Sequence, residues 1–243
     1  MPRLLLLLAV LLAALTSPAS AADAETSPTL NKWQQLYLDR TALFQKENAA
    51  LEPDARPIVF AGDSITQGMP IAALFPGEHV LNRGISSDGT ADFPGTQPPH
   101  LRGLVHRYEA SIRDARPRVL FILIGTNDVG MKNIDLAWWE SNLETILDRV
   151  AKDLPDCRVV LQTLPPSGPP YKRVETLNAR AKEYSERLKA LAARRGLPII
   201  DLWQLYASPE GILPPEFTRD GLHLKKEAYE RWAQAARPHF SAN

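Results

Sequence analysis

Short apolar runs alternate with longer amphipathic segments through most of this chain. Five runs, rich in branched residues and too short for helices, predict buried strands at 58–61, 80–81, 119–124, 159–161 and 199–202. Segments typical of helices lie at 31–50, 136–153, 174–195 and 225–236, with a weaker pattern at 101–115. Strands that alternate with helices indicate an α/β fold, with a parallel sheet covered by helices on both faces.

Segments with polar residues come after four of these predicted strands. In open parallel sheets, ligands bind beyond the carboxyl ends of the strands. The segments that should therefore meet at one edge are 62–64, 83–88, 125–128 and 165–168. In the first of them we expect Gly62 to let the chain turn tightly, Asp63 to bond neighbouring N–H groups and Ser64 to stand at the edge of the sheet.

The first 21 residues have the features of a secretory signal peptide. A basic start at Arg3 precedes a leucine-rich run, and small residues follow at Ala19 and Ala21. The run is too short to cross a bilayer, which needs about 20 apolar residues, so we expect no stable membrane insertion. The chain is 44% hydrophobic and 23% charged with no long linker, which predicts one globular domain over 22–243. We expect it to be secreted or periplasmic after cleavage near Ala21.

Positive and negative charges are balanced. The chain has 28 basic and 28 acidic residues, and loss of residues 1–21 with Arg3 leaves 27 minus 28, a net charge of about −1. This balance argues against nucleic acid or an anionic membrane as the partner. Cys157 is the only cysteine, so it has no internal disulfide partner and is interpreted as a small structural residue. No histidine or cysteine cluster has ligand spacing, so no metal or other cofactor is expected.

A serine and a distant histidine are the candidates for nucleophilic chemistry. Ser64 is a weak nucleophile unless a base accepts its proton. His223 follows Asp220 by three residues, with Gly221 between them to turn the backbone. A carboxylate that holds the Nδ1–H of a histidine fixes its tautomer and stabilises the imidazolium. The same spacing is also typical of a helix N-terminal turn capped by the aspartate, and the residues alone leave both interpretations open.

The other histidines have surroundings less typical of a catalytic base. His79 precedes a predicted strand, His106 falls within the weaker helical pattern and His239 lies near the C-terminus, so each is interpreted as a surface or helix residue. His100 lies in a proline-rich loop, 93–100, which could overhang the site and contact a substrate.

Acyl transfer also requires donors for the oxygen that becomes negative in the tetrahedral intermediate. The side-chain amide of Asn127, at the end of the longest apolar run, is a neutral donor suited to this task. The same Thr126-Asn127-Asp128 segment is equally typical of a plain strand-to-helix turn. Backbone N–H groups of Ser64 and of the 84–89 loop are further candidate donors.

Taken in order, four motifs resemble the SGNH, or GDSL, hydrolase superfamily over about residues 56–236: Gly62-Asp63-Ser64, the segment 82–90, Gly125-Thr126-Asn127-Asp128 and Asp220-Gly221-Leu222-His223. The resemblance implies a flavodoxin-like three-layer fold with a central parallel five-stranded sheet. It also implies an esterase site with Ser64 as nucleophile, His223 as base, Asp220 as its orienter, and an oxyanion hole of Ser64, Ser87 and Asn127. Ser87 stands where the family has a glycine, and its N–H would still donate unless the loop requires a positive φ.

Within the superfamily, segments 82–85 and 125–128 look most like the platelet-activating-factor acetylhydrolase-like branch. We therefore expect a serine esterase that hydrolyses a short acyl ester, an acetyl above all, on a small molecule or a carbohydrate. A lysophospholipase or thioesterase is the nearest alternative, and a non-catalytic carbohydrate-binding module on the same fold is another. The 93–100 loop could narrow the pocket, and Trp138-Trp139 could be core, interface or sugar platform.

Overall fold

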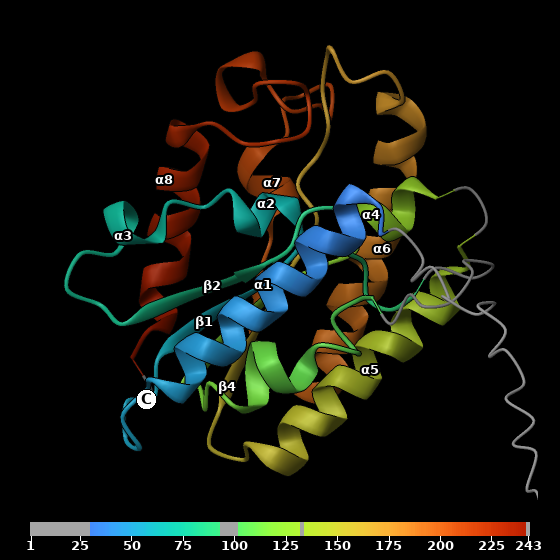
Figure 1. Cartoon of the computed structure of the whole chain (residues 1–243). Helices are drawn as coiled ribbons and strands as arrows, with labels where there is room; N and C mark the ends of the chain where they lie inside the picture. Colours follow the sequence, from blue (N-terminus) through green and yellow to red (C-terminus); the bar gives the residue numbers. More distant parts are fainter. Residues whose placement is uncertain (1–29, 93–101, 132–133, 242–243) are drawn as a thin grey trace, which may run out of the picture.

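Five parallel strands form one central sheet in the computed structural model, which describes residues 30–92, 102–131 and 134–241. The strands are β1 (Ile58–Gly62), β2 (Val80–Gly84), β3 (Val119–Leu123), β4 (Arg158–Gln162) and β5 (Ile199–Ile200), in the order β2-β1-β3-β4-β5 (Figure 1). Every neighbouring pair is parallel, which confirms the predicted sheet. The predicted signal peptide at 1–21 and the 93–100 loop with His100 lie outside the described residues.

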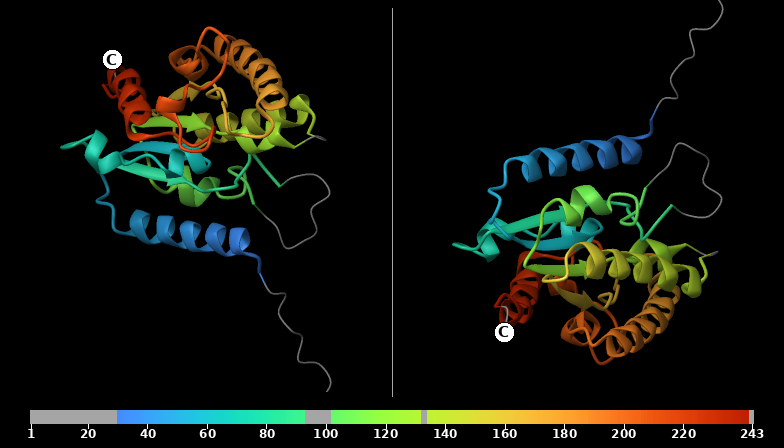
Figure 2. Two further views of the ribbon diagram at one scale, coloured as in Figure 1. Left: turned by 90° about the horizontal axis from the view of Figure 1, so that it is seen from above. Right: turned by 90° about the horizontal axis from the view of Figure 1, so that it is seen from below.

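Helices cover both faces of the sheet and complete three layers. The helices α1 (Lys32–Ala49) and α8 (Lys226–Ala236) lie on opposite faces (Figure 2). α5 (Leu136–Asp153) packs on α6 (Val174–Arg195) and on the π-helical turn η1 (Glu109–Arg113), which also contacts α1. The strand order reverses at β1, which has β2 on one side and β3 on the other. The carboxyl ends of β1 and β3 are therefore the place where such a fold binds ligands.

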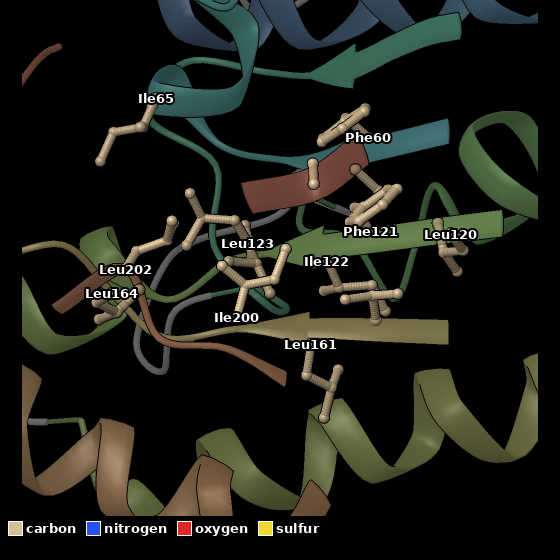
Figure 3. Packing of buried hydrophobic residues seen from close by; sticks show 14 of the residues in the cluster. Phe60, Ile65, Leu120, Phe121, Ile122, Leu123, Leu161, Leu164, Ile200 and Leu202 are labelled. Atoms are coloured by element: carbon tan, nitrogen blue, oxygen red, sulfur yellow. The ribbon is translucent and has the colours of Figure 1, made fainter. Parts of the chain in front are cut away.

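Aromatic side chains anchor the two central strands. Phe60 of β1 and Phe121 of β3 are in register, and their ring centroids stack 4.4 Å apart (Figure 3). Trp232 of α8 meets Phe60 edge-on at 6.1 Å, and all three side chains are fully buried. Burial of each such side chain contributes about 1.5–3 kcal/mol. This packing fixes the strands that lead into Ser64 and Asn127.

The long helices begin and end where the sequence predicts. Asn31 caps α1 in a capping box with Gln34, and Asp135 caps α5 by accepting the N–H of Ala137. α6 ends at Gly196, whose φ of 64° is the left-handed conformation common after helices. The predicted helices at 31–50, 136–153, 174–195 and 225–236 are confirmed to within one residue at each end.

The weaker helical pattern at 101–115 does not correspond to a regular helix. Its described part consists of turns followed by η1, so His106 lies in a turn; the residue is exposed, which confirms the surface alternative of its interpretation as a surface or helix residue. The physical reason lies at Gly103, where φ is 104° and an added Cβ would lie 2.3 Å from Cα of Ala91. A regular helix accommodates neither that dihedral angle nor that approach.

Several one-turn helices were not predicted because one turn is too short to show a periodic pattern. They are α2 (Ser64–Gln67), α3 (Ile71–Leu74), α4 (Thr126–Gly130) and α7 (Leu202–Tyr206). The fifth strand accordingly stops at Ile200, because Asp201 caps α7 through the N–H of Gln204. Trp139 is fully buried against Tyr184, which places it in the core. Across the described ranges no helix combines the length and apolarity that a bilayer span requires.

Candidate active site

Ser64, His223 and Asp220 form one hydrogen-bonded row. Ser64 is the first residue of α2, directly after β1, and its Oγ lies 3.0 Å from Nε2 of His223. Nδ1 of the same ring lies 2.7 Å from Oδ2 of Asp220. Ser64 and His223 are 159 residues apart in the sequence. The fold thus brings together the nucleophile, base and orienter that the motifs predict, in the order that proton transfer requires.

The loop that carries Asp220 and His223 is a compact turn and no part of a helix. Thr218, at its N-terminal end, forms an isolated antiparallel bridge with Leu224, and the Thr218 hydroxyl accepts the N–H of Gly221 at 2.9 Å. Gly221 has a φ of 84°, the left-handed conformation that favours glycine. Because α8 begins only at Lys226, the alternative that Asp220 caps this helix is wrong.

Asp220 is held in its ionised form. Its partial burial would raise the pKa, but hydrogen bonds from the His223 ring and from the backbone N–H groups of His223 and Leu222 outweigh it and lower the pKa. Those N–H groups lie 2.8 and 3.0 Å from Oδ1, which leaves Oδ2 for the imidazole. The carboxylate can therefore keep Nδ1 protonated, so that Nε2 faces Ser64 with a free lone pair.

Gly62 and Asp63 shape the turn before Ser64 in different ways. Oδ1 of Asp63 accepts the N–H of Ile65 at 2.9 Å, which confirms that it braces the turn. Its side chain is fully buried, and burial raises the pKa to about 6. The expected role of Gly62 is wrong: its φ is not positive, and an added Cβ would lie 2.1 Å from the carbonyl oxygen of Leu123. Gly62 is required by close packing and not by a tight turn.

Candidate donors for a developing oxyanion lie close to Ser64. The Ser64 N–H belongs to the first turn of α2, where backbone N–H groups have no intrahelical partner. The 85–90 loop is joined to this turn by the N–H of Ile85 on Gly62 O, at 3.0 Å, and the N–H of Ser86 on Gln67 Oε1, at 2.6 Å. Ser87 follows, and within the described part of the chain its N–H has no acceptor. This N–H is available to a substrate.

Ser87 adopts the conformation that the family glycine would adopt easily. Its φ is 62°, so the loop does require a positive φ here. Serine tolerates this region less well than glycine, but the backbone N–H is retained. Its carbonyl oxygen accepts Nη2 of Arg102 at 2.8 Å, which holds the peptide in place.

Asn127 lies in α4 and is hydrogen-bonded to the 85–90 loop. Its Nδ2 donates to the carbonyl oxygen of Asp88 at 2.8 Å, and the second N–H of this amide remains for a ligand. The preceding Gly125 has a φ of 130°, and an added Cβ would lie 2.4 Å from the Tyr184 ring. The segment is thus a strand-to-helix turn and a donor site at once, so the two interpretations of Asn127 do not exclude each other.

Fully buried carboxylates lie directly behind these donors. Asp88 accepts Nε of Arg107 at 2.7 Å, and Oδ1 of Asp128 accepts the backbone N–H of Thr90 at 3.1 Å and its hydroxyl at 2.5 Å. Burial raises the pKa of Asp128 to about 6, and it also raises the pKa of Asp88, against the opposing charge of Arg107. No local signal in the sequence identified Arg107, Arg102 or Gln67, because each reaches its partners across the fold.

The remaining sequence candidates lie elsewhere. His106 faces Asp92 at 3.7 Å, and His239 meets the edge of Phe121. Cys157 is half-buried, and burial raises the pKa of its thiol to about 12. Among the residues that the structure describes, no group of three or more histidine, cysteine or acidic side chains could hold a metal ion.

Comparison with known proteins gives one family and a set of structural neighbours. The model of the GDSL-like lipase/acylhydrolase family matches residues 60–231. A candidate platelet activating factor from Streptococcus pneumoniae is 24% identical, covering 86% of this chain and 94% of its own, with a TM-score of 0.72. A GDSL-like lipase from Bacteroides thetaiotaomicron is 20% identical, with coverages of 82% and 96% and a TM-score of 0.69. An acetyl xylan esterase is 21% identical, with coverages of 76% and 100% and a TM-score of 0.62. No curated protein matches the sequence.

Proposed function

Because this chain belongs to the GDSL-like lipase/acylhydrolase family and is therefore an acyl hydrolase, we propose that it cleaves a short-chain ester through an acyl-enzyme on Ser64. One observation carries the proposal: Ser64 Oγ, the His223 ring and the Asp220 carboxylate lie in one row with distances of 3.0 and 2.7 Å. A serine with this support is a nucleophile at neutral pH, whereas an isolated serine is not.

In the acylation step, Ser64 Oγ attacks the ester carbonyl carbon as His223 Nε2 takes the hydroxyl proton. The carbonyl oxygen becomes negative and accepts hydrogen bonds from the N–H groups of Ser64 and Ser87 and from the Asn127 amide. The carbonyl re-forms when the C–O bond to the alcohol breaks, and His223 returns its proton to the leaving oxygen. Asp220 stabilises the transient imidazolium throughout.

Water completes the cycle. His223 Nε2 takes a proton from the water that attacks the acyl carbon, and the same donors hold the second oxyanion. When this intermediate collapses, Ser64 regains its proton from His223 and the carboxylic acid leaves. The reaction needs no redox partner, because every bond change is a proton or acyl transfer.

An acetyl or similarly short acyl group is the proposed substrate, on a carbohydrate or another small alcohol. The acetyl xylan esterase among the structural neighbours supports this choice. A lysophospholipase or thioesterase specificity is the second candidate, and the platelet-activating-factor acetylhydrolase-like motif pattern at 82–85 and 125–128 agrees with either. We also propose export after cleavage near Ala21, which N-terminal sequencing of the purified protein would test.

The test compares wild type with Ser64→Ala on p-nitrophenyl esters from acetate to palmitate. Ser141→Ala is the matched control, because Ser141 is an exposed serine on α5. We expect the S64A variant to lose nearly all turnover and all labelling by a fluorophosphonate probe, with S141A equal to wild type. Equal rates for S64A and wild type would refute the assignment. A maximum at long acyl chains would favour the lysophospholipase alternative.

A further inference from the structure

Arg107 is a fully buried cation just behind the candidate oxyanion donors. Its side chain is 0% exposed, as is that of its partner Asp88. Nε donates to Asp88 Oδ2 at 2.7 Å, Nη1 donates to the carbonyl oxygen of Arg83 and to the Ser111 hydroxyl at 2.7 and 2.8 Å, and Nη2 donates to the carbonyl oxygen of Gly62 at 2.8 Å. A buried arginine with all three nitrogens engaged is rigidly held.

These partners belong to separate parts of the site. Gly62 ends β1, two residues before the nucleophile, and Arg83 is the penultimate residue of β2. Asp88 directly follows Ser87, whose backbone N–H is a candidate oxyanion donor. The carbonyl oxygen of Asp88 accepts the side-chain amide of Asn127, which is another candidate donor. One guanidinium therefore connects the strand that presents Ser64 to the loop on which both remaining donors depend.

We propose that Arg107 is a positioning residue, which sets the distance between Ser64 and the donors at Ser87 and Asn127 through its bonds to Gly62 and Asp88. The proposal rests on the function proposed above, because it concerns the same site. A displacement of about 1 Å in such donors costs roughly 100-fold in rate. Arg107 hydrogen-bonds none of the three proposed triad side chains, so its effect on them passes through its partners, the Gly62 carbonyl oxygen and the Asp88 carboxylate.

The fork of the arginine is the property that matters. A lysine at this position would keep the positive charge opposite Asp88, but its single nitrogen cannot reach the Asp88 carboxylate and the carbonyl oxygens of Gly62 and Arg83 together. Arg107→Lys therefore separates geometry from charge. Asp88→Asn is the second variant, because it keeps an acceptor of the same shape and removes only the carboxylate charge.

Arg83 offers a matched control. Its side chain is 1% exposed, and its guanidinium bonds Glu47 and Asn48 of α1 and lies over the Phe44 ring, on the α1 side of the sheet. Arg83→Lys removes a buried arginine fork of similar size that supports no candidate donor. A loss of stability without loss of turnover is expected there.

The experiment measures kcat and KM on p-nitrophenyl acetate for wild type, R107K, D88N and R83K, after thermal unfolding has shown which variants fold. For R107K we expect kcat to fall about 10- to 100-fold with KM within about threefold, and a smaller fall for D88N. R83K should lower the unfolding temperature and leave kcat within about threefold of wild type. Should R107K not fold, the same comparison is made with D88N.

A second measurement distinguishes positioning from general loss of structure. In an Asn127→Ala background one of the two donors is already gone and only the Ser87 N–H still depends on Arg107, so R107K should lower kcat by a smaller factor there than in wild type. An undiminished loss in that background, or a loss in R83K equal to that in R107K, would overturn the proposal, as would R107K with wild-type kcat. If S64A turns over like wild type, the proposed function itself is wrong. If only S64A is inactive and R107K is normal, the inference on Arg107 fails alone.

Discussion

Replacement of Ser87 by glycine should stabilise the protein without loss of activity. Ser87 has a φ of 62°, where an L-residue carries a cost of about 1–2 kcal/mol. Glycine removes that cost, but it makes the unfolded chain more flexible, which offsets about 0.5–1 kcal/mol. The expected net gain is about 0.5–1 kcal/mol in the free energy of unfolding. For a domain of this size, that corresponds to a rise of about 1–4 °C in Tm.

The same substitution one position earlier is the control. Ser86 has no positive φ and donates its N–H to Gln67, so Ser86→Gly relieves no backbone strain. Its only expected effect is a more flexible unfolded chain, which lowers the free energy of unfolding. We expect it to lower Tm by an amount similar to the rise in S87G. The serine side chain thus changes identically in both variants, and only the backbone conformation of the position differs.

Thermal unfolding and kcat/KM on p-nitrophenyl acetate together test the role of Ser87. Glycine keeps the backbone N–H, so kcat/KM should stay within about threefold of wild type. A fall in Tm for S87G as large as that for S86G would refute the strain argument. A loss of kcat/KM beyond about tenfold would show that the hydroxyl, and not the N–H, is what the site uses at this position.

Three further outcomes follow from the site. Asp220→Asn should lower kcat by roughly 10⁴-fold with little change in KM, measured on p-nitrophenyl acetate, because the histidine then takes the wrong tautomer. Gly221→Ala should lower both Tm and kcat, because the added Cβ would lie 1.9 Å from the carbonyl oxygen of Gly168. Gly77→Ala is its control: Gly77 has a φ of 82° and no atom within 4 Å of the added Cβ, so this substitution should lower the free energy of unfolding in urea by only about 1–2 kcal/mol, through backbone strain. Asp63, whose pKa rises from 3.8 to about 6 in the fold, binds its proton more tightly when folded, so it destabilises the protein as pH rises through that window. Stability of Asp63→Asn relative to wild type should therefore increase by about 2 kcal/mol between pH 4.5 and pH 7.5 in urea unfolding.

The fold was largely predictable because its signals are local. The strand runs are apolar without alternation, as both faces of the sheet are covered, and β1 and β3 are buried at every residue. The limits of α5 and α6 agree with the predicted 136–153 and 174–195 because Asp135 and Gly196 carry cap chemistry readable in a single sequence. The helix predicted at 101–115 was wrong because its signal is not local: the close approach of Gly103 to Ala91 is a tertiary contact.

In the candidate site, the residues within local motifs were predictable and the residues that support them were not. Ser64, Asp220, His223 and Asn127 lie within short motifs whose residue types suit their chemistry, and the fold places them as the motifs predict. Their supports do not lie in motifs. Arg107 reaches the ends of β1 and β2 from a segment that follows both, and a buried arginine is visible in a sequence only as a charge among apolar residues.

The roles of the glycines show why part of the site could not be predicted from the sequence. A position can require glycine because its φ is positive or because there is no room for a Cβ, and the sequence does not distinguish these two reasons. At Gly62 only the second applies, because the Leu123 carbonyl oxygen lies 2.1 Å from where Cβ would be. At Gly77 only the first applies, and at Gly221 both do. Conversely, Ser87 meets the first condition without being a glycine, and it keeps the backbone N–H that the proposed oxyanion role uses, which any residue but proline can supply.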